Sequence, residues 1–355
     1  MRTAVVGAGI AGLACTRALV EEGHEVTVYE AAAHPSGRIA TLRTNGVSDQ
    51  SGIVADHGAR YFSARFERFL HEVESWIDRG EAARWQPRTV AINDAGVPEA
   101  QIERLMRFVG VPTMDAPLRA LATGLESRAE FRYATPVRTI HHASGDWVVT
   151  DDSGRREHFD AVATAVPAPG AVQLLTEVAH LHTAAARVPM APCWSLALRF
   201  AERLPLDYDA ARVNLGARHE HAGVLAWADR ESSKPGRSED EVWVLQSSDQ
   251  FAREHIGSDE SEISTVMLDA FFAATGIDRI DPAAHHARLW KAALPVAPLC
   301  DGCLYDEQLR IGACGDWCMG ARVEGAYLSG LAMADRLNGR HRDFLATCSL
   351  AHHSA

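Results

Sequence analysis

The chain has 355 residues, of which 47% are hydrophobic and 23% are charged. These proportions are ordinary for a folded globular protein and exclude disordered, collagen-like and fibrous chains, and the length allows two domains at roughly 150 residues each. Lys and Arg number 35 against 47 Asp and Glu, so the net charge is −12. The chain therefore lacks the basic field that nonspecific binding to nucleic acids or anionic membranes requires.

Cysteine content and the start of the chain indicate a cellular compartment. Seven cysteines in a long chain do not resemble the dense framework of a small secreted domain, so we expect reduced thiols. Residues 3–6 run directly into a glycine-rich turn rather than a signal-like apolar stretch, and no apolar run of about 18 residues occurs. We expect a cytoplasmic protein without a membrane segment.

The first thirty residues alternate strand, turn, helix and strand. The pattern predicts a strand at residues 3–6, a helix at 13–22 and a second strand at 25–29 that ends at Glu30. The turn before the helix consists of Gly7, Ala8, Gly9, Ile10, Ala11 and Gly12. Its glycines permit a tight turn, close approach of the backbone to a pyrophosphate at the helix N-terminus, and close helix packing. The unit predicts dinucleotide binding, and the Glu30 carboxylate favours FAD or NAD over NADP because it repels a 2′-phosphate.

The middle of the chain leaves this unit twice. Residues 66–77 have apolar positions at helical spacing and predict a helix that leaves the nucleotide domain. Short strands between residues 130 and 150 and a strand at 160–166 are expected to return to the first sheet. A strand-rich second unit then follows, in which the polar residues 230–241 predict a solvated loop. Its expected strands are residues 194–200, 224–228, 242–246 and 289–293, with a helix around 263–271.

A second strand, turn and helix stands near the end of the chain. Residues 309–314 predict the strand, Gly315 and Asp316 the turn, and residues 324–337 a helix that starts with small residues. Together with the first turn and with the segments 36–38 and 56–59, this motif resembles the FAD-dependent amine oxidase superfamily. Within it the chain is most similar to bacterial renalase-like proteins, and the resemblance covers nearly the whole chain.

The resemblance implies an α/β fold in which a Rossmann-type FAD-binding domain carries a discontinuous α+β substrate domain, as in amine oxidases and p-hydroxybenzoate hydroxylase. We assign residues 1–65, 130–170 and 300–342 to the FAD-binding domain, 66–129 and 171–299 to the substrate domain, and 343–355 to a C-terminal tail. It also implies noncovalent FAD, with Asp316 at the ribityl–pyrophosphate region and Val137 beside the adenosine. The other implied cofactor residues are Gly7 to Gly12, Glu30, Gly37, Arg38, Gly58, Ala59, Gly315, Arg322, Val323 and Glu324.

The implied reaction is oxidation of a small substrate by hydride transfer to flavin N5, with isomeric dihydronicotinamide dinucleotides as the leading substrate class and O2 as an acceptor that yields H2O2. A dihydropyridine becomes an aromatic pyridinium, so the reaction needs no protein base, and we predict no catalytic side chain. An aromatic-lined slot suffices, although core packing is the alternative for each of its aromatic residues. Its expected residues are Arg60, Tyr61, Phe62, Gln246 and Trp290.

Several of these positions differ from the renalase-like pattern, which tends to carry Gln in place of Arg60 and His in place of Gln246. The substrate therefore stays open between a dihydronicotinamide and an amine or another small molecule. Some amine oxidases use a lysine that holds water near N5. Lys291 is a candidate for this role, but it and Trp290 point to opposite faces of one strand, and we favour Trp290.

Other patterns in the sequence receive less weight. Cys300, Cys303, Cys314 and Cys318 form two close pairs, but their spacing does not match a zinc ribbon, and we expect neither a metal nor a thioether from Cys318 to the flavin. No nucleophile elbow, Walker loop or zinc-protease motif occurs. The remaining alternatives are a flavin-binding module without turnover and an NAD dehydrogenase. The oligomeric state stays open.

Overall fold

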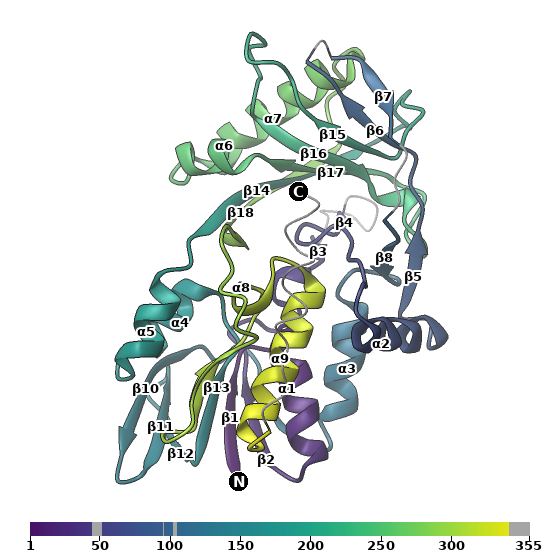
Figure 1. The fold of residues 1–355 in the computed structure, drawn as a ribbon. Helices are drawn as coiled ribbons and strands as arrows, with labels where there is room; N and C mark the ends of the chain where they lie inside the picture. Colours follow the sequence, from purple (N-terminus) through teal and green to yellow (C-terminus); the bar gives the residue numbers. More distant parts are fainter. Residues whose placement is uncertain (45–51, 95, 102–104, 341–355) are drawn as a thin grey trace.

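A computed structural model describes residues 1–44, 52–94, 96–101 and 105–340. The chain forms two main sheets, one near each end of the molecule in Figure 1. The predicted tail, residues 343–355, and the last two residues assigned to the FAD-binding domain lie outside the described residues. No helix of the described ranges is long and apolar enough to span a membrane.

The first sheet has six strands in the order β19-β20-β13-β1-β2-β9. All of its strand pairs are parallel except β19 with β20. The strands are β1 (Arg2–Val6), β2 (Glu25–Tyr29), β9 (Glu130–Arg132), β13 (Ala161–Thr164), β19 (Leu304–Asp306) and β20 (Ile311–Ala313). Apolar cores cover both of its faces, as a parallel sheet requires.

Helices α1 (Ile10–Glu21) and α9 (Val323–Leu337) pack against each other on one face of this sheet (Figure 1). Gly330 permits the approach, because a Cβ there would overlap the carbonyl oxygen of Ala11. The opposite face is covered by a three-stranded sheet and two short helices. These elements are β10 (Val137–Ala143), β11 (Asp146–Asp151), β12 (Arg156–Phe159), α4 (Ala168–Leu174) and α5 (Ala179–Ala186).

The second sheet has seven strands in the order β18-β14-β17-β16-β15-β6-β7. They are β6 (Thr89–Ile92), β7 (Pro98–Ala100), β14 (Met190–Phe200), β15 (Ala210–Val213), β16 (Leu225–Arg230), β17 (Glu241–Ser247) and β18 (Ala284–Pro295). Its outer face packs on helices α6 (Asp249–Glu254) and α7 (Glu260–Thr275) through residues such as Trp194 and Leu245. Its inner face places Val242 and Val244 against Ile53 and Ala55. The alternation along β17 therefore separates a helix-covered face from one that meets the N-terminal part of the chain.

Residues 66–129, predicted to belong to the substrate domain, are shared between the two sheets. Only β6 and β7 join the second sheet, whereas α2 (Glu67–Asp78), β5 (Ala82–Trp85), β8 (Arg107–Gly110) and α3 (Ala116–Leu125) bury apolar residues in the core of α1 and α9. Phe69 of α2, in the segment expected to leave the nucleotide domain, packs against Tyr327 of α9. The domain boundaries stay predictions.

The expectation that residues 230–241 form a solvated loop is only partly right: Gly236 and residues 238–240 are exposed, whereas three of the charged residues before them are buried. Arg230, Glu231 and Lys234 are 0%, 3% and 2% exposed. Their charges pair inside the protein, with Lys234 Nζ contacting both Asp229 and Glu231 around the short helix η2 (Glu231–Ser233). Long-range partners that the local composition does not reveal have drawn this segment into the interior.

Candidate functional site

The glycine turn between β1 and α1 lies at the carboxyl edge of the parallel sheet. Gly7 adopts φ +108°, which an L side chain rarely tolerates, and a Cβ on Gly12 would overlap the carbonyl oxygen of Gly7. Gly9 has an ordinary φ of −75°, and a Cβ there would meet only the Cα of Gly37, at 3.8 Å. Gly7 and Gly12 thus shape the turn itself, while Gly9 leaves open space above it.

The start of α1 is suited to an anion. No side chain caps this helix at Gly9, and the first turn begins with Ile10 and Ala11. Unpaired N–H groups and the helix dipole attract phosphate at such an end. Gly37, with φ +53°, and the 3-10 helix η1 (Gly37–Ile39) bring a second backbone turn to the same place.

Glu30 stands at the end of β2, where the prediction puts the adenosine ribose. It is 9% exposed, and its carboxylate accepts hydrogen bonds from the backbone N–H of Ala8 at 2.7 Å and of Ala32 at 2.8 Å. The carbonyl of Glu30 also accepts from the N–H of Thr135 at 2.8 Å, and this holds the approach to Val137 at the start of β10. The predicted ADP-binding residues are thus neighbours.

An ion pair joins the N-terminal and C-terminal motifs. Arg38 donates from Nη1 to Asp316 Oδ2 at 2.8 Å and from Nη2 to Asp316 Oδ1 at 2.6 Å. Asp316 begins the short helix α8 (Asp316–Met319) directly after Gly315, and its side chain is 7% exposed against 26% for Arg38. Two residues that the resemblance assigns to one cofactor therefore meet, although 278 positions separate them in the chain.

The start of α9 is the second helix end at this edge. Arg322 stands at its N-cap without a capping side chain, and Val323 is its first residue. Glu324 is 1% exposed, and its Oε1 accepts from the N–H groups of Arg65 at 2.6 Å and Phe66 at 2.8 Å, at the start of α2. Its Oε2 is buried without a hydrogen-bond partner.

These features fit FAD. Two uncapped helix ends, at α1 and α9, suit the pyrophosphate and the electron-rich edge of a flavin. Buried polar atoms without partners, Glu324 Oε2 and His57 Nδ1, lie in segments that the resemblance places at the cofactor. The Rossmann turn, Glu30 and the C-terminal motif together fit a dinucleotide that spans both helices.

The segment Asp56–Ala59 packs tightly against the Arg38 turn. A Cβ on Gly58 would overlap the carbonyl oxygen of Arg38, and that same oxygen accepts from the N–H of Ala59 at 2.8 Å. Two predicted substrate residues reach this segment from the second sheet. Gln246 donates to the carbonyl of Gly58 at 2.7 Å, and the Trp290 indole N–H donates to that of His57 at 2.8 Å.

Arginines and aromatic rings alternate beside this segment. The Arg60 guanidinium lies 4.4 Å from the ring centroid of Trp227 and 5.6 Å from that of Tyr61. Arg107 lies 4.5 Å from the Tyr61 ring and 5.3 Å from the Trp227 ring. Burial lowers the pKa of Arg60. We call Arg60, Tyr61, Arg107 and Trp227 the cation–aromatic cluster. Trp227 and Arg107 were not predicted from the sequence.

Phe62, the next predicted slot residue, lies in the core. It is 4% exposed, stacks on Phe108 at 5.9 Å between ring centroids, and meets Phe69 and Trp76 edge to face. Lys291 is exposed, whereas Trp290 on the same strand contacts the His57 ring at 5.2 Å between centroids. The two side chains thus occupy different surroundings, as their adjacent positions on β18 require.

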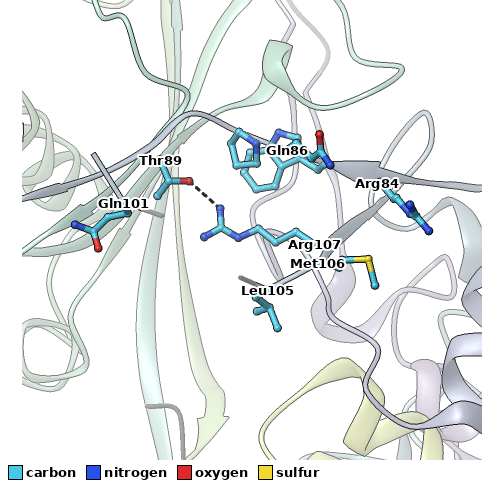
Figure 2. Close-up of a pocket in the computed structure, with 9 residues that line it drawn as sticks. Arg84, Gln86, Thr89, Gln101, Leu105, Met106 and Arg107 are labelled. Carbon is cyan, nitrogen blue, oxygen red and sulfur yellow. Dashed lines mark hydrogen bonds between the residues drawn. The ribbon is translucent and has the colours of Figure 1, made fainter. Parts of the chain in front are cut away.

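A pocket of about 310 Å³ lies next to the cluster, between β5, β6 and β8 (Figure 2). Arg107 extends into it and donates to Thr89 Oγ1 at 3.1 Å. Its lining residues are Arg84, Trp85, Gln86, Pro87, Thr89, Gln101, Leu105, Met106 and Arg107. The predicted cofactor and substrate residues are not among them, and this pocket adjoins the predicted site through Arg107 and through Trp85, whose ring lies 6.1 Å from that of Tyr61 between centroids.

The expectation of reduced thiols is wrong for Cys300, which is disulfide-bonded. Three other cysteines of the two close pairs lie in an environment that disfavours metal binding. Cys303, Cys314 and Cys318 are buried, and burial raises the pKa of Cys303 to about 12 and that of Cys318 well above its ordinary value. Zinc binds thiolates, which such burial suppresses. Within the described part of the chain, no group of three His, Cys, Asp or Glu residues is arranged to hold a metal ion.

Comparison with known proteins identifies the family. Residues 5–73 match the NAD(P)-binding Rossmann-like domain, and residues 100–338 match the flavin containing amine oxidoreductase model. Over 78 residues, 22% of this chain, the sequence is 32% identical to a 4,4'-diapophytoene desaturase of Staphylococcus haemolyticus, of which the match covers 16%. Over 127 residues, 36% of this chain, it is 26% identical to a 15-cis-phytoene desaturase of Synechococcus elongatus, of which the match covers 24%.

Solved structures share the fold at low sequence identity. A protein of Exiguobacterium sp. 255-15, named as a candidate protoporphyrinogen oxidase, superposes with a TM-score of 0.74 at 15% identity over 95% of this chain and 99% of its own. A putrescine oxidase mutant superposes with a TM-score of 0.70 at 13% identity over 96% of this chain and 100% of its own.

The predicted α/β fold with a Rossmann-type unit is thereby confirmed, and so is the predicted class of flavin-dependent oxidoreductase. Residues 100–338 make up more than half of the sequence. The protein belongs to the flavin containing amine oxidoreductase family, whose cofactor is a flavin, typically FAD.

Proposed function

We propose that this protein oxidises isomeric dihydronicotinamide dinucleotides with noncovalently bound FAD, and that O2 accepts the electrons. The similarity to renalase-like proteins suggests this substrate class. The observation that carries the proposal is the cation–aromatic cluster beside Asp56–Ala59, because it combines flat rings with two guanidinium groups. Arg60 and Tyr61 are its half-buried members, and they suit a planar pyridine ring on an anionic carrier.

The bound FAD supplies a hydride acceptor at N5. The chain holds the cofactor and orients the substrate: α1 and Glu30 hold the ADP half, Asp316 the ribityl region, and the start of α9 the flavin edge. A dihydronicotinamide loses one hydride and becomes a pyridinium. O2 takes up the two electrons and the proton of that hydride, with one further proton from water, to give H2O2. No protein base takes part in this balance.

The charges of the cluster distinguish the substrate classes. Arg60 and Arg107 repel a protonated amine and attract the phosphates of a dinucleotide. Noncovalent attachment is supported by the burial of Cys318, whose thiol donates to the carbonyl of Ala313 at 3.6 Å. Amine oxidation, which the family name also covers, is therefore the second choice.

Anaerobic mixing of the purified holoprotein with candidate donors tests the proposal. We expect dihydronicotinamide isomers to bleach the flavin and amines such as putrescine to leave it oxidised. The variant Arg60→Met should raise the dinucleotide Kd about tenfold because it removes one charge contact. Arg187→Met, at the exposed C-cap of α5, is the matched control. Bleaching by amines alone contradicts the proposal, and a flavin that no donor reduces favours a binding module.

A further inference from the structure

The inner face of the second sheet presents a row of polar side chains. Gln246 of β17 pairs with Trp227 of β16 and with Ser195 of β14, and Ser195 pairs with Arg288 of β18. Paired residues of antiparallel strands point to the same face, and so does Trp290, two residues beyond Arg288. This face is the one that packs on Ile53 and Ala55. The row therefore faces the Asp56–Ala59 segment.

Two side chains of the row donate hydrogen bonds to the backbone of that segment. Gln246 Nε2 donates to the Gly58 carbonyl at 2.7 Å, and Trp290 Nε1 donates to the His57 carbonyl at 2.8 Å. From the other side, the Arg38 carbonyl accepts from Ala59, and Gly58 has no room for a side chain. These two neighbouring peptide groups are thus held between the second sheet and the cofactor turn.

A buried ion cluster holds the first residue of the same segment. Asp56 is 0% exposed and accepts from Met114 N at 3.0 Å and from Thr41 Oγ1 at 2.8 Å. Lys234 Nζ lies 3.5 Å from Asp56 Oδ2 and 2.8 Å from Asp229 Oδ2, and Arg237 also pairs with Asp56. Opposite charges removed from water attract one another strongly when each is hydrogen-bonded. Asp56 is therefore tied to Lys234 and Arg237, which both follow η2 in the chain.

We infer that Gln246, Trp290 and Lys234 are positioning residues, which fix residues 56–59 at the flavin from the substrate side. For its effect on the reaction, the inference rests on the proposed function. In this role Gln246 and Trp290 donate to the protein backbone, whereas as walls of the predicted slot they would contact the substrate.

Amide hydrogen exchange in the substrate-free holoprotein separates the two roles. We expect Trp290→Phe and Gln246→Met to speed exchange in residues 56–62 about tenfold, because each removes one donor and keeps most of the side-chain volume. Trp194→Phe is the matched control: its indole donates to the His255 carbonyl at 3.1 Å, and it lies in the outer core of the same sheet. Unchanged exchange in both inner-face variants, or an equal increase in Trp194→Phe, overturns the inference.

The flavin gives a second measurement. Trp290→Phe and Gln246→Met should retain FAD and bind the dinucleotide with unchanged Kd, but be reduced about tenfold more slowly, because the reacting atoms are held less firmly. The visible spectrum and reduction potential of the bound FAD should also shift in these variants and not in Trp194→Phe. A raised Kd with unchanged spectrum and exchange contradicts positioning. If no dihydronicotinamide reduces the wild type, the proposed function fails, while exchange and potential still test the positioning.

Discussion

The turn at residues 7–12 and the segment at residues 230–237 are both short and rich in small residues, yet the protein uses them in opposite ways. The turn leaves its backbone open at the start of α1, and its shape depends on contacts between Gly7 and Gly12 only five residues apart. The segment buries its charges against Asp56 and Asp229. Local sterics therefore suffice for a ligand cradle, whereas a buried ion cluster needs distant partners.

The titration of the ion cluster reflects this difference. Burial raises the pKa of Glu231 to about 7, with the carboxylates of Asp56 and Asp229 adding to the effect and Lys234 opposing it. Burial also disfavours the charge of Asp56, but Lys234 and Arg237 outweigh it and lower its pKa to about 2. Lys234 and Arg237 thus stabilise the charged form of Asp56 more than that of Glu231. As the pH falls, Glu231 therefore takes up a proton before Asp56 does.

Substitutions of Gly12 and Gly9 give the largest expected effects. They distinguish the glycine that shapes the turn from the glycine that leaves room for the ligand. Gly12→Ala should destabilise the chain by about 3 kcal/mol, because its Cβ overlaps the carbonyl oxygen of Gly7. Gly9→Leu should fold normally and lose FAD, because its Cβ meets only Gly37 while its side chain fills the pyrophosphate path. Thermal unfolding of the apoprotein and FAD content after purification measure the two effects. Normal FAD content in Gly9→Leu would refute the assigned binding mode.

Lys234→Met should lower the free energy of unfolding by about 3 to 5 kcal/mol, because it leaves Asp56, Asp229 and Glu231 buried without their shared cation. Denaturant titration measures the change. The control is Lys291→Met, which alters the only other lysine of the sequence at an exposed position and should stay within about 0.5 kcal/mol of the wild type. Equal losses in both variants would show that the cluster is not a source of stability.

The smallest expected effect concerns pH. Glu231 has an ordinary pKa of 4.5 when unfolded and about 7 when folded. Between these values the folded chain binds more protons at this group, so its contribution to the free energy of unfolding is present below pH 4.5 and is lost as the pH rises towards 7. Glu231→Gln should flatten this fall, which denaturant titrations at pH 5 and pH 8 can measure. A wild-type slope that persists in the variant argues against Glu231 as its source.

Most elements were predictable because their signals are local. The strand predicted at residues 25–29 coincides with β2, and the predicted helices at 13–22 and 324–337 differ from α1 and α9 by a few residues. The apolar spacing of residues 66–77 also predicted α2 correctly, but not its partner, since an apolar face does not specify which core it joins. The contacts of Trp227 and Arg107 in the cation–aromatic cluster were not predicted either, because their local sequence does not specify which side chains they meet.

The sequence by itself determined the glycine turns and the alternation of strands, because each depends on residues within about one structural unit of each other. It also indicated the flavin family, through a resemblance that several separate motifs carry. Tertiary structure alone decided that Arg38 meets Asp316 and that Lys234 is buried. It also decided that Gln246 and Trp290 donate hydrogen bonds to a backbone segment that lies far from both of them in the sequence. Charged groups and hydrogen-bond donors pair with groups that lie close to them in space, whatever their separation in the sequence. Their pairing therefore emerges only when the two sheets are brought together.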